Sequence, residues 1–184
     1  MTKKITFSQL LEQSKGMPIL VANRGIPARR ICRSIRERLK AHAIITVTDI
    51  DHSSPALSAA DEVMLLGTNP TAYLDIAEIV TRAKERGVQA IHPGWGFASE
   101  DPAFSRLCSE AGITFIGPDP EPMEQLGSKL QARRLAQKLG IPIVPGSDGG
   151  VSLEEARAIV EKMELPVLLK AEGGGGGRGI VIIR

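Results

Sequence analysis

We predict an α/β protein with a mainly parallel sheet, followed by a smaller unit that contains a glycine-rich hairpin. Short apolar runs alternate with helical patterns from Pro18 onward, which is the order expected of βαβ units. The alternation of strand and helix patterns ends after residue 140. There, prolines and glycines precede one helical pattern and two apolar segments on either side of a glycine run. These observations predict the two parts of the fold.

The elements of the first part follow from periodicity and from end signals. Residues 1–16 are predicted to form a short amphipathic extension that stops at Gly16. Strands are expected in the apolar runs at 19–22, 43–47, 62–66, 88–91 and 113–116. Helices are expected from Pro27 and over 71–86, 101–111, 121–126 and 128–139.

The helix at 101–111 has the clearest signals. Asp101 is a suitable N-cap, Pro102 suits the first helical position, and Gly112 marks the stop. We expect burial of the stripe at i, i+3, i+4 and i+7, which consists of Phe104, Leu107, Cys108 and Ala111.

Turn and capping signals divide the chain into domains. Residues 17–120 are predicted to form the first domain, because the proline-rich turn at 117–120 breaks the pattern. Residues 121–140 then form a helical connector. Residues 141–184 form a separate unit whose helix begins at a capping box, Ser152 with Glu155. One helix and three short strands bury little core, so this unit is expected to be incomplete.

The composition excludes several classes of protein. The chain is 42% hydrophobic and 24% charged, as in ordinary globular proteins. A formal charge of +2 and an aromatic content of 3% argue against nucleic-acid and membrane surfaces. Cys32 and Cys108 lie within apolar helical patterns and are expected to be reduced core residues. Without an apolar run of spanning length or a signal-peptide core, we expect a cytoplasmic protein.

The glycine run at 173–177 indicates an anion-binding hairpin. Each ordered glycine costs about 0.5–1 kcal/mol of backbone entropy, so a turn alone would not favour five of them. Bare amides can converge on a phosphate, and Lys170 and Arg178 add positive charge. A flexible linker would usually have unstructured flanks, whereas these flanks are apolar. A P-loop would need Gly-Lys-Ser/Thr before a helix, whereas Gly179 precedes a β-branched segment.

Two loops follow predicted strands at the edge where open α/β sheets bind ligands. The segment Asn23–Pro27 has one glycine and lacks a dinucleotide fingerprint, so it is predicted to be a tight turn before a helix. Asp49 and Asp51 could mimic a ribose-binding acid, but without the glycines they are interpreted as turn residues.

The loop from His92 to Glu100 combines a histidine, two glycines, two aromatic residues and a carboxylate. It is either one wall of an active site or a structural loop in which Trp95 and Phe97 cap the sheet. His92 alone would more often be structural. Glu100 would equally suit the start of a helix.

Two lysines are candidate phosphate ligands. Lys129 lies in the first turn of a predicted helix, where a cation opposes the helix dipole unless an anion compensates it. Alone it would be a surface lysine. Lys170 ends an apolar strand that is expected to be buried, and a desolvated lysine needs a negative partner.

Together these motifs resemble the N-terminal part of biotin carboxylase, the ATP-grasp component of biotin-dependent carboxylases. The resemblance covers about residues 17–184. It is carried by the segments 21–25, 59–62, 92–100, 115–118, 127–129, 144–147 and 170–179.

The resemblance implies a Rossmann-like pre-ATP-grasp domain followed by the small flap lobe of an ATP-grasp domain. It also implies an ATP-dependent carbon–nitrogen ligase that uses MgATP to activate bicarbonate as carboxyphosphate and carboxylates carrier-bound biotin. Implied partners are a biotin carboxyl carrier protein, a carboxyltransferase component and a second copy in a homodimer. The Mg²⁺ ligands and catalytic arginine would lie in a lobe after Arg184, so the chain is not expected to complete the reaction alone.

The same resemblance implies roles for individual residues. His92, Trp95 and Glu100 would face bicarbonate and biotin. Arg30, Arg33 and Glu37 would lie at the dimer interface. The implied ATP ligands are Lys129, Lys170, Gly175, Gly176, Gly177, Arg178 and Gly179.

The sequence departs from the family pattern at several positions. Ile26 and Pro27 replace a usual Glu-Ile pair, Trp95 replaces a usual tyrosine, and Ser128 replaces a usual aspartate. Another ATP-grasp ligase, of the carbamoyl-phosphate or purine-pathway type, would share the flap but lack the His92–Glu100 motif. A noncatalytic nucleotide-binding or assembly module is the alternative from a different class.

Overall fold

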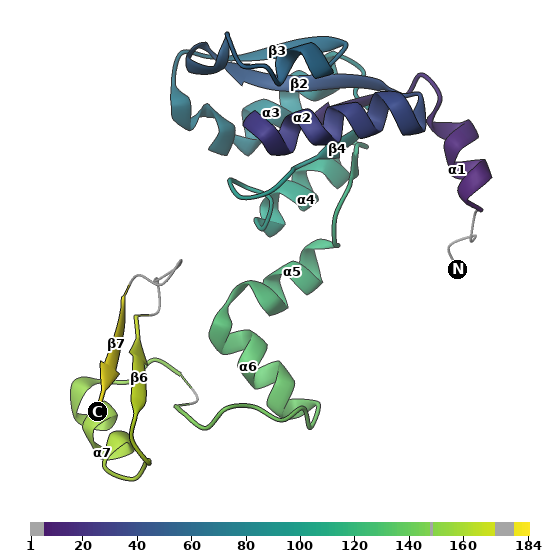
Figure 1. Ribbon diagram of the computed structural model, residues 1–184. Helices are drawn as coiled ribbons and strands as arrows, with labels where there is room; N and C mark the ends of the chain where they lie inside the picture. The colour runs from purple at the N-terminus through teal and green to yellow at the C-terminus, as the bar shows by residue number, and fades with distance from the viewer. Residues whose placement is uncertain (1–5, 148, 172–178) are drawn as a thin grey trace. The chain divides into compact units, whose positions relative to one another are not determined.

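The computed structural model describes residues 6–147, 149–171 and 179–184 (Figure 1). The chain divides into two compact units, Met1–Glu124 and Gln125–Arg184, and each is described by itself. The predicted glycine ligands Gly175, Gly176 and Gly177 lie outside the described residues, as does Arg178. Among the described residues, no helix is both long and apolar enough to span a bilayer.

A parallel sheet of five strands forms the centre of the first unit, in the order β3-β2-β1-β4-β5. Every pairing in it is parallel, which confirms the predicted α/β class. The strands are β1 (Pro18–Val21), β2 (His42–Thr48), β3 (Glu62–Gly67), β4 (Ala90–His92) and β5 (Thr114–Phe115). Each of the five strand predictions differs from the structure by one or two residues at one end or at both.

Helices and short helical turns connect these strands. The α-helices are α1 (Phe7–Ser14), α2 (Gly25–Ser34), α3 (Ile76–Glu85), α4 (Pro102–Glu110) and α5 (Pro120–Gly127). Helix α2 continues as a π-helical segment, η1 (Ile35–Leu39). The 3₁₀ turns are η2 (Asp49–Asp51), η3 (Leu57–Ala59) and η4 (Pro70–Leu74).

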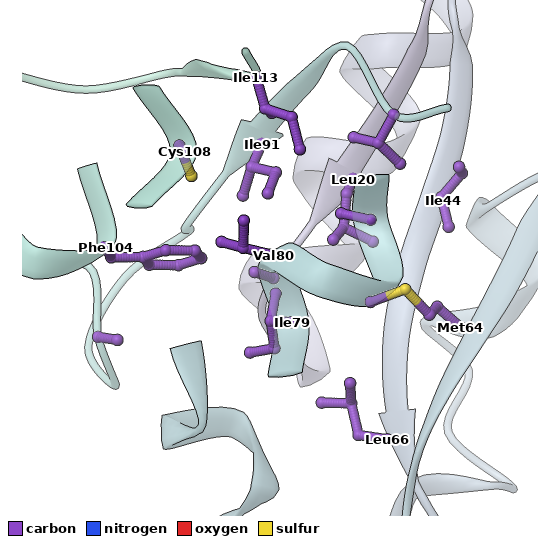
Figure 2. Close-up of a cluster of buried hydrophobic side chains, with 14 of the residues drawn as sticks. Leu20, Ile44, Met64, Leu66, Ile79, Val80, Ile91, Phe104, Cys108 and Ile113 are labelled. Carbon is purple, nitrogen blue, oxygen red and sulfur yellow. The ribbon is translucent and has the colours of Figure 1, made fainter. Parts of the chain in front are cut away.

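Both faces of the central strands β1, β2 and β4 are buried, because their side chains alternate between two cores. On β1, Ile19 and Val21 pack with α2, whereas Leu20 packs with α3 and α4. Figure 2 shows the second of these cores, where Leu20 lies near Ile44, Met64 and Ile91. The result is a three-layer unit, as expected when a parallel sheet is covered on both sides.

The helix predicted over 71–86 is two elements. The 3₁₀ turn η4 ends at Leu74, and α3 begins at Ile76. Asp75 separates them, since its side-chain oxygen Oδ1 accepts a hydrogen bond from the backbone N–H of Glu78 at 3.1 Å. An aspartate inside an apparently continuous helical pattern is thus a local N-cap.

The predicted N-cap of α4 and the predicted state of the cysteines are confirmed, and the predicted stripe is confirmed in part. Asp101 caps α4 through a 2.9 Å hydrogen bond from the backbone N–H of Ala103. Phe104 and Cys108 are buried in the core, whereas the other two residues of the stripe are only partly buried against it. Cys32 and Cys108 are free thiols, and burial raises the pKa of each to about 12. Both are therefore protonated, unreactive core residues at neutral pH.

The second unit contains α6 (Lys129–Lys138), α7 (Leu153–Val160) and an antiparallel hairpin of β6 (Val167–Lys170) and β7 (Ile180–Ile183). Ser128 caps α6, so the serine that replaces a usual aspartate is itself a favoured N-cap residue. The predicted capping box of α7 is present, with Ser152 and Glu155 bonded in both directions.

Two expectations for this unit are corrected. Its described residues form two strands and not three, because residues 141–145 pair with no strand. The strand before Lys170 is not buried: Val167 is the one buried residue of β6, whereas Leu168 is 53% exposed. Apolar composition alone could not tell a core strand from one that the described residues leave uncovered.

Candidate functional site

The candidate site lies at the carboxyl edge of the parallel sheet. Three polar segments begin there, one after each of the neighbouring strands β2, β1 and β4. Because parallel strands end at a common edge, residues far apart in sequence meet in this place. The contacts below connect these segments.

The loop after β4 has an unusual backbone. Gly94 and Gly96 have φ angles of +74° and +67°, which favour glycine. Phe97 has a φ angle of +48°, and a bulky residue rarely adopts this left-handed conformation. Such strain persists only where surrounding contacts hold it, and it concentrates at functional sites.

Asn23 holds one side of this loop. Its side chain is buried, and its Nδ2 atom donates to the backbone oxygens of Pro93 and Trp95, both at 2.9 Å. Its Oδ1 atom accepts from the backbone N–H of Arg24 at 2.9 Å. The amide therefore uses both donor hydrogens on a loop 70 or more residues away.

His92 has a structural contact within the loop. Its Nδ1 atom accepts a 3.0 Å hydrogen bond from the backbone N–H of Gly94, which assigns the proton of the neutral ring to Nε2. Burial lowers the pKa of His92 below its ordinary value of 6.5. The ring is therefore neutral at pH 7, and protonation would replace this acceptor with a donor.

We expect the stability of the chain to depend on the protonation of His92. Because the folded pKa is lowered, the unfolded state binds more protons just below pH 6.5, and the free energy of unfolding falls as the pH decreases from there. The slope from this one proton is at most about 1.4 kcal/mol per pH unit. Urea unfolding between about pH 7.5 and about pH 5.5 measures it.

His92→Asn is the matched control, because its amide oxygen replaces the Nδ1 acceptor without titrating. His42 and His52 remain in both proteins, so the difference between the two pH profiles isolates His92. Identical slopes in the two proteins would contradict the assignment.

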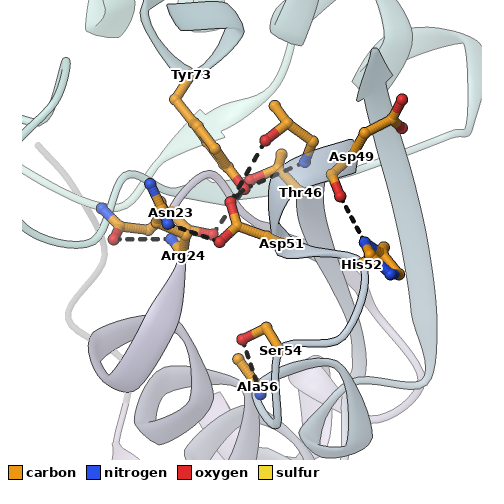
Figure 3. Close-up of polar contacts among 10 residues, drawn as sticks. Asn23, Arg24, Thr46, Asp49, Asp51, His52, Ser54, Ala56 and Tyr73 are labelled. Carbon is orange, nitrogen blue, oxygen red and sulfur yellow. Dashed lines mark hydrogen bonds and ion pairs between the residues drawn. The ribbon is translucent and has the colours of Figure 1, made fainter. Parts of the chain in front are cut away.

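A buried carboxylate, Asp51, joins the ends of β1 and β2 to η4 (Figure 3). Its Oδ1 atom forms a 2.7 Å ion pair with Arg24, and its Oδ2 atom accepts a 2.8 Å hydrogen bond from the hydroxyl of Tyr73. Interpreting Asp51 as a turn residue missed this role. Sequence alone offers a weak signal, an acid in the turn that follows an apolar strand, and does not identify Tyr73 as its partner.

The three predicted substrate-side residues differ in their surroundings. His92 is half-buried, Trp95 is 77% exposed, and Glu100 is exposed. Trp95 therefore does not cap the sheet, which was the structural alternative. The backbone of its loop is fixed by Asn23 while its indole faces outward.

The predicted nucleotide ligands that are described all belong to the second unit. Lys129 is the first residue of α6, and Lys170 is the last residue of β6. Both are exposed. Lys170 is paired with Ile180, and the backbone N–H of Ala171 donates to the oxygen of Gly179 at 2.8 Å. The register thus places Lys170 at the base of the glycine segment.

The predicted dimer residues lie on one exposed surface of α2 and η1. Arg30, Arg33 and Glu37 are all exposed, and Arg33 pairs with Glu37 at 3.2 Å within the helix. A shallow groove runs along the same surface and is also lined by Ile26, which is 84% exposed. Among the described residues, no group of three His, Cys, Asp or Glu side chains is placed to hold a metal ion.

Comparison with known proteins assigns both units. Residues 16–123 match the family described as "Biotin carboxylase, N-terminal domain". Residues 128–184 match "Carbamoyl-phosphate synthase L chain, ATP binding domain". The first match covers more than half of the chain and defines its class, a biotin carboxylase N-terminal domain.

Relatives with curated names agree with this class. The chain is 45% identical over 168 residues to the 2-oxoglutarate carboxylase small subunit of Hydrogenobacter thermophilus, which covers 90% of this chain and 35% of that protein. It is 44% identical over 169 residues to the biotin carboxylase of Halalkalibacterium halodurans, covering 90% and 37%. The chain therefore spans about a third of the length of these relatives.

A crystal structure gives the same result. The biotin carboxylase domain dimer of H. thermophilus 2-oxoglutarate carboxylase, in complex with MgADP, ADP and bicarbonate, is 44% identical and has a TM-score of 0.85. The similarity covers 91% of this chain and 37% of that chain. This chain belongs to the biotin carboxylase N-terminal domain family, and it is homologous to the N-terminal region of biotin carboxylases.

Proposed function

We propose that the chain acts in a biotin carboxylase, in which ATP activates bicarbonate for the carboxylation of carrier-bound biotin. The observation that carries the proposal is the order of the two family matches, a biotin carboxylase N-terminal domain followed by an ATP-binding region. The bound MgADP and bicarbonate of the H. thermophilus relative support the same substrates. By itself the chain is proposed to be inactive, and a carrier protein and a carboxyltransferase component are its proposed partners.

Within this proposal, the second unit binds the phosphates of ATP. Lys129 and Lys170 supply positive charge, and the amides of Gly175–Gly177 and Gly179, with Arg178, complete the phosphate contacts. Charge-assisted hydrogen bonds of this kind are stronger than neutral ones. Mg²⁺ is proposed to accompany the phosphates of ATP. We also propose domain boundaries at residues 120 and 140.

The first unit is proposed to present a substrate wall and a dimer interface. His92, Trp95 and Glu100 would face bicarbonate and biotin. Trp95 offers a flat apolar surface but no hydroxyl, unlike the tyrosine usual in the family. The exposed surface with Arg30, Arg33 and Glu37 would contact a second copy, as supported by the dimer of the relative. We propose a cytoplasmic location, which the two free thiols favour.

We expect Lys170→Ala to raise the KM for ATP at least about ten-fold, because it removes a charge from the phosphate site. The measurement uses a chimaera in which residues 16–184 replace the matching region of the H. halodurans enzyme, assayed for bicarbonate- and biotin-dependent ATP hydrolysis. Lys162→Ala is the control, since Lys162 is another exposed lysine of the same unit. It should change the KM less than about two-fold.

The chimaera also tests the function itself. Hydrolysis that is indifferent to biotin would reject biotin carboxylase and favour another ATP-grasp ligase. A folded chimaera without nucleotide binding would favour an assembly module. Equal KM values for the Lys170→Ala and parent chimaeras would overturn the role of Lys170.

A further inference from the structure

We infer that Asp51, Arg24 and Tyr73 form a positioning unit for the loop that carries Trp95, although none of the three belongs to that loop. The inference deepens the proposed function. The identity of the ligand at Trp95 rests on that proposed function, whereas the positioning role rests on the contacts described below. Its starting point is the left-handed backbone of Phe97, which needs a contact to hold it.

Tyr73 supplies that contact. The rings of Tyr73 and Phe97 lie 5.2 Å apart between centroids, at an interplanar angle of 36°. This separation is in the range of favourable aromatic pairs. Tyr73 is 1% exposed, whereas Phe97 is 45% exposed. Phe97, which is strained and partly exposed, therefore packs against a tyrosine ring that is buried in the core.

Hydrogen bonds fix the orientation of Tyr73. Its hydroxyl donates to Oδ2 of Asp51 at 2.8 Å and accepts from the backbone N–H of Thr48 at 3.3 Å. Burial, and then the bond to Asp51, raises the pKa of Tyr73 to about 12, so the hydroxyl remains a donor at neutral pH. Turning the hydroxyl outward would break both bonds, and ionisation would remove the hydrogen that is donated to Asp51.

Arg24 completes the unit by holding the other oxygen of the carboxylate. Its Nη2 atom lies 2.7 Å from Oδ1 of Asp51, and its Cζ atom lies 5.9 Å from the centroid of the Tyr73 ring. Arg24 thus touches both other members, by an ion pair and by a cation–π contact. Figure 3 shows the three side chains converging from the ends of β1 and β2 and from η4.

The loop is consequently held on both sides of Trp95. Asn23 binds the backbone oxygens of Pro93 and Trp95, and Tyr73 supports Phe97 two residues later. The indole between them is 77% exposed. Two anchors on the backbone around Trp95 restrict the positions that its exposed ring can reach, which lowers the entropy lost on binding a ligand. We assign Asp51, Arg24 and Tyr73 as positioning residues on this basis.

The test uses the fluorescence of Trp95, the single tryptophan of the chain, in the full 184-residue protein. The fast component of the anisotropy decay measures how far the indole moves on the nanosecond timescale. In Tyr73→Leu and Phe97→Asn, which remove the ring contact, we expect the amplitude of this component to rise about two-fold. Tyr73→Phe keeps the ring without its hydroxyl bonds and should give a smaller rise, a partial rescue.

Two controls separate positioning from general loosening. Asp49→Asn changes an exposed carboxylate of η2, the 3₁₀ turn that also contains Asp51. Ile19→Val destabilises the other buried core, which does not include Tyr73. Both should leave the amplitude unchanged, even where Ile19→Val lowers the Tm. Equal increases in the controls would overturn the inference.

Phe97→Asn tests the same ring contact if Tyr73→Leu fails to fold. Phe97 is partly exposed, and asparagine tolerates the left-handed region, so this variant removes the ring from an otherwise intact fold. Wild-type motion of Trp95 in that variant would refute the inference. No ATP, bicarbonate or biotin is present in the measurement, so its failure is distinct from a failure of the proposed function.

Discussion

Gly94→Ala is expected to lower the free energy of unfolding by about 3 kcal/mol, of which about 1–2 comes from the left-handed backbone and the rest from overpacking. A Cβ atom at this position would lie 2.5 Å from Nδ2 of Asn23 and 2.6 Å from its Cβ. Asn23 cannot move away, because its amide is bonded to the backbone oxygens of Pro93 and Trp95. The substitution therefore breaks the hydrogen bonds between Asn23 and the loop, and it also strains the backbone at position 94.

Gly96→Ala is the matched control for this prediction. Gly96 has a similar φ angle of +67°, but no heavy atom of the described residues, its two chain neighbours aside, lies within 4 Å of the position its Cβ would take. Its cost should be the backbone cost alone, about 1–2 kcal/mol. Urea unfolding followed by far-UV circular dichroism measures both variants. Similar losses in the two would show that close contact with Asn23 is not what requires glycine at position 94.

The sheet was predictable because each strand carries its own signal. Ile19, Leu20 and Val21 are all buried on alternating faces, and such continuous apolar runs occur where helices cover both sides of a parallel sheet. Helix ends with local caps, such as Asp101, were predictable for the same reason. Both signals act within a few residues of chain.

The errors in the fold arose where a local pattern has two structural outcomes. Asp75 fits the polar positions of a helical pattern, yet its side chain caps a new helix and divides the segment. Leu168 and Leu169 have the composition of a buried strand, yet both are exposed in the hairpin. Deciding these cases requires knowing what packs against the segment, which periodicity does not contain.

The candidate site was predictable only as a set of loops. The glycines, aromatic residues and histidine of the 92–100 segment mark an unusual connection, and the structure shows in addition that its backbone is strained. The residues that hold it were missed, because Asn23 and Tyr73 act over long sequence separations. An asparagine shortly after an apolar strand, such as Asn23, is the signal in the sequence that could have indicated this role.

Asn23→Asp is expected to lower the free energy of unfolding by about 3–5 kcal/mol at pH 7, the cost of an uncompensated buried charge. The new side chain has the same shape and keeps the acceptor for the backbone N–H of Arg24. It loses both donor hydrogens, so a carboxylate would face the backbone oxygens of Pro93 and Trp95. Arg24 does not compensate, since its guanidinium already binds Asp51.

The pH dependence of this variant distinguishes lost donors from altered shape. Burial beside two carbonyl oxygens raises the pKa of the introduced carboxyl above its unfolded value of about 3.9. Between those two pKa values the folded state holds more protons, so the stability of Asn23→Asp falls as the pH rises. Its deficit relative to the parent protein should therefore be smaller at about pH 5 than at about pH 7.

Asn69→Asp is the control, because the side-chain oxygen of Asn69 accepts hydrogen bonds from the backbone N–H and the hydroxyl of Thr71. Asn69 is exposed and no bond from its amide hydrogens is needed to cap η4, so an aspartate there should change stability by less than about 0.5 kcal/mol. Urea unfolding at both pH values measures the two variants. If Asn23→Asp lost no more stability than Asn69→Asp, the two donor bonds of Asn23 would not be the anchor of the Trp95 loop. The contact of Tyr73 with Phe97 would then be what positions the loop.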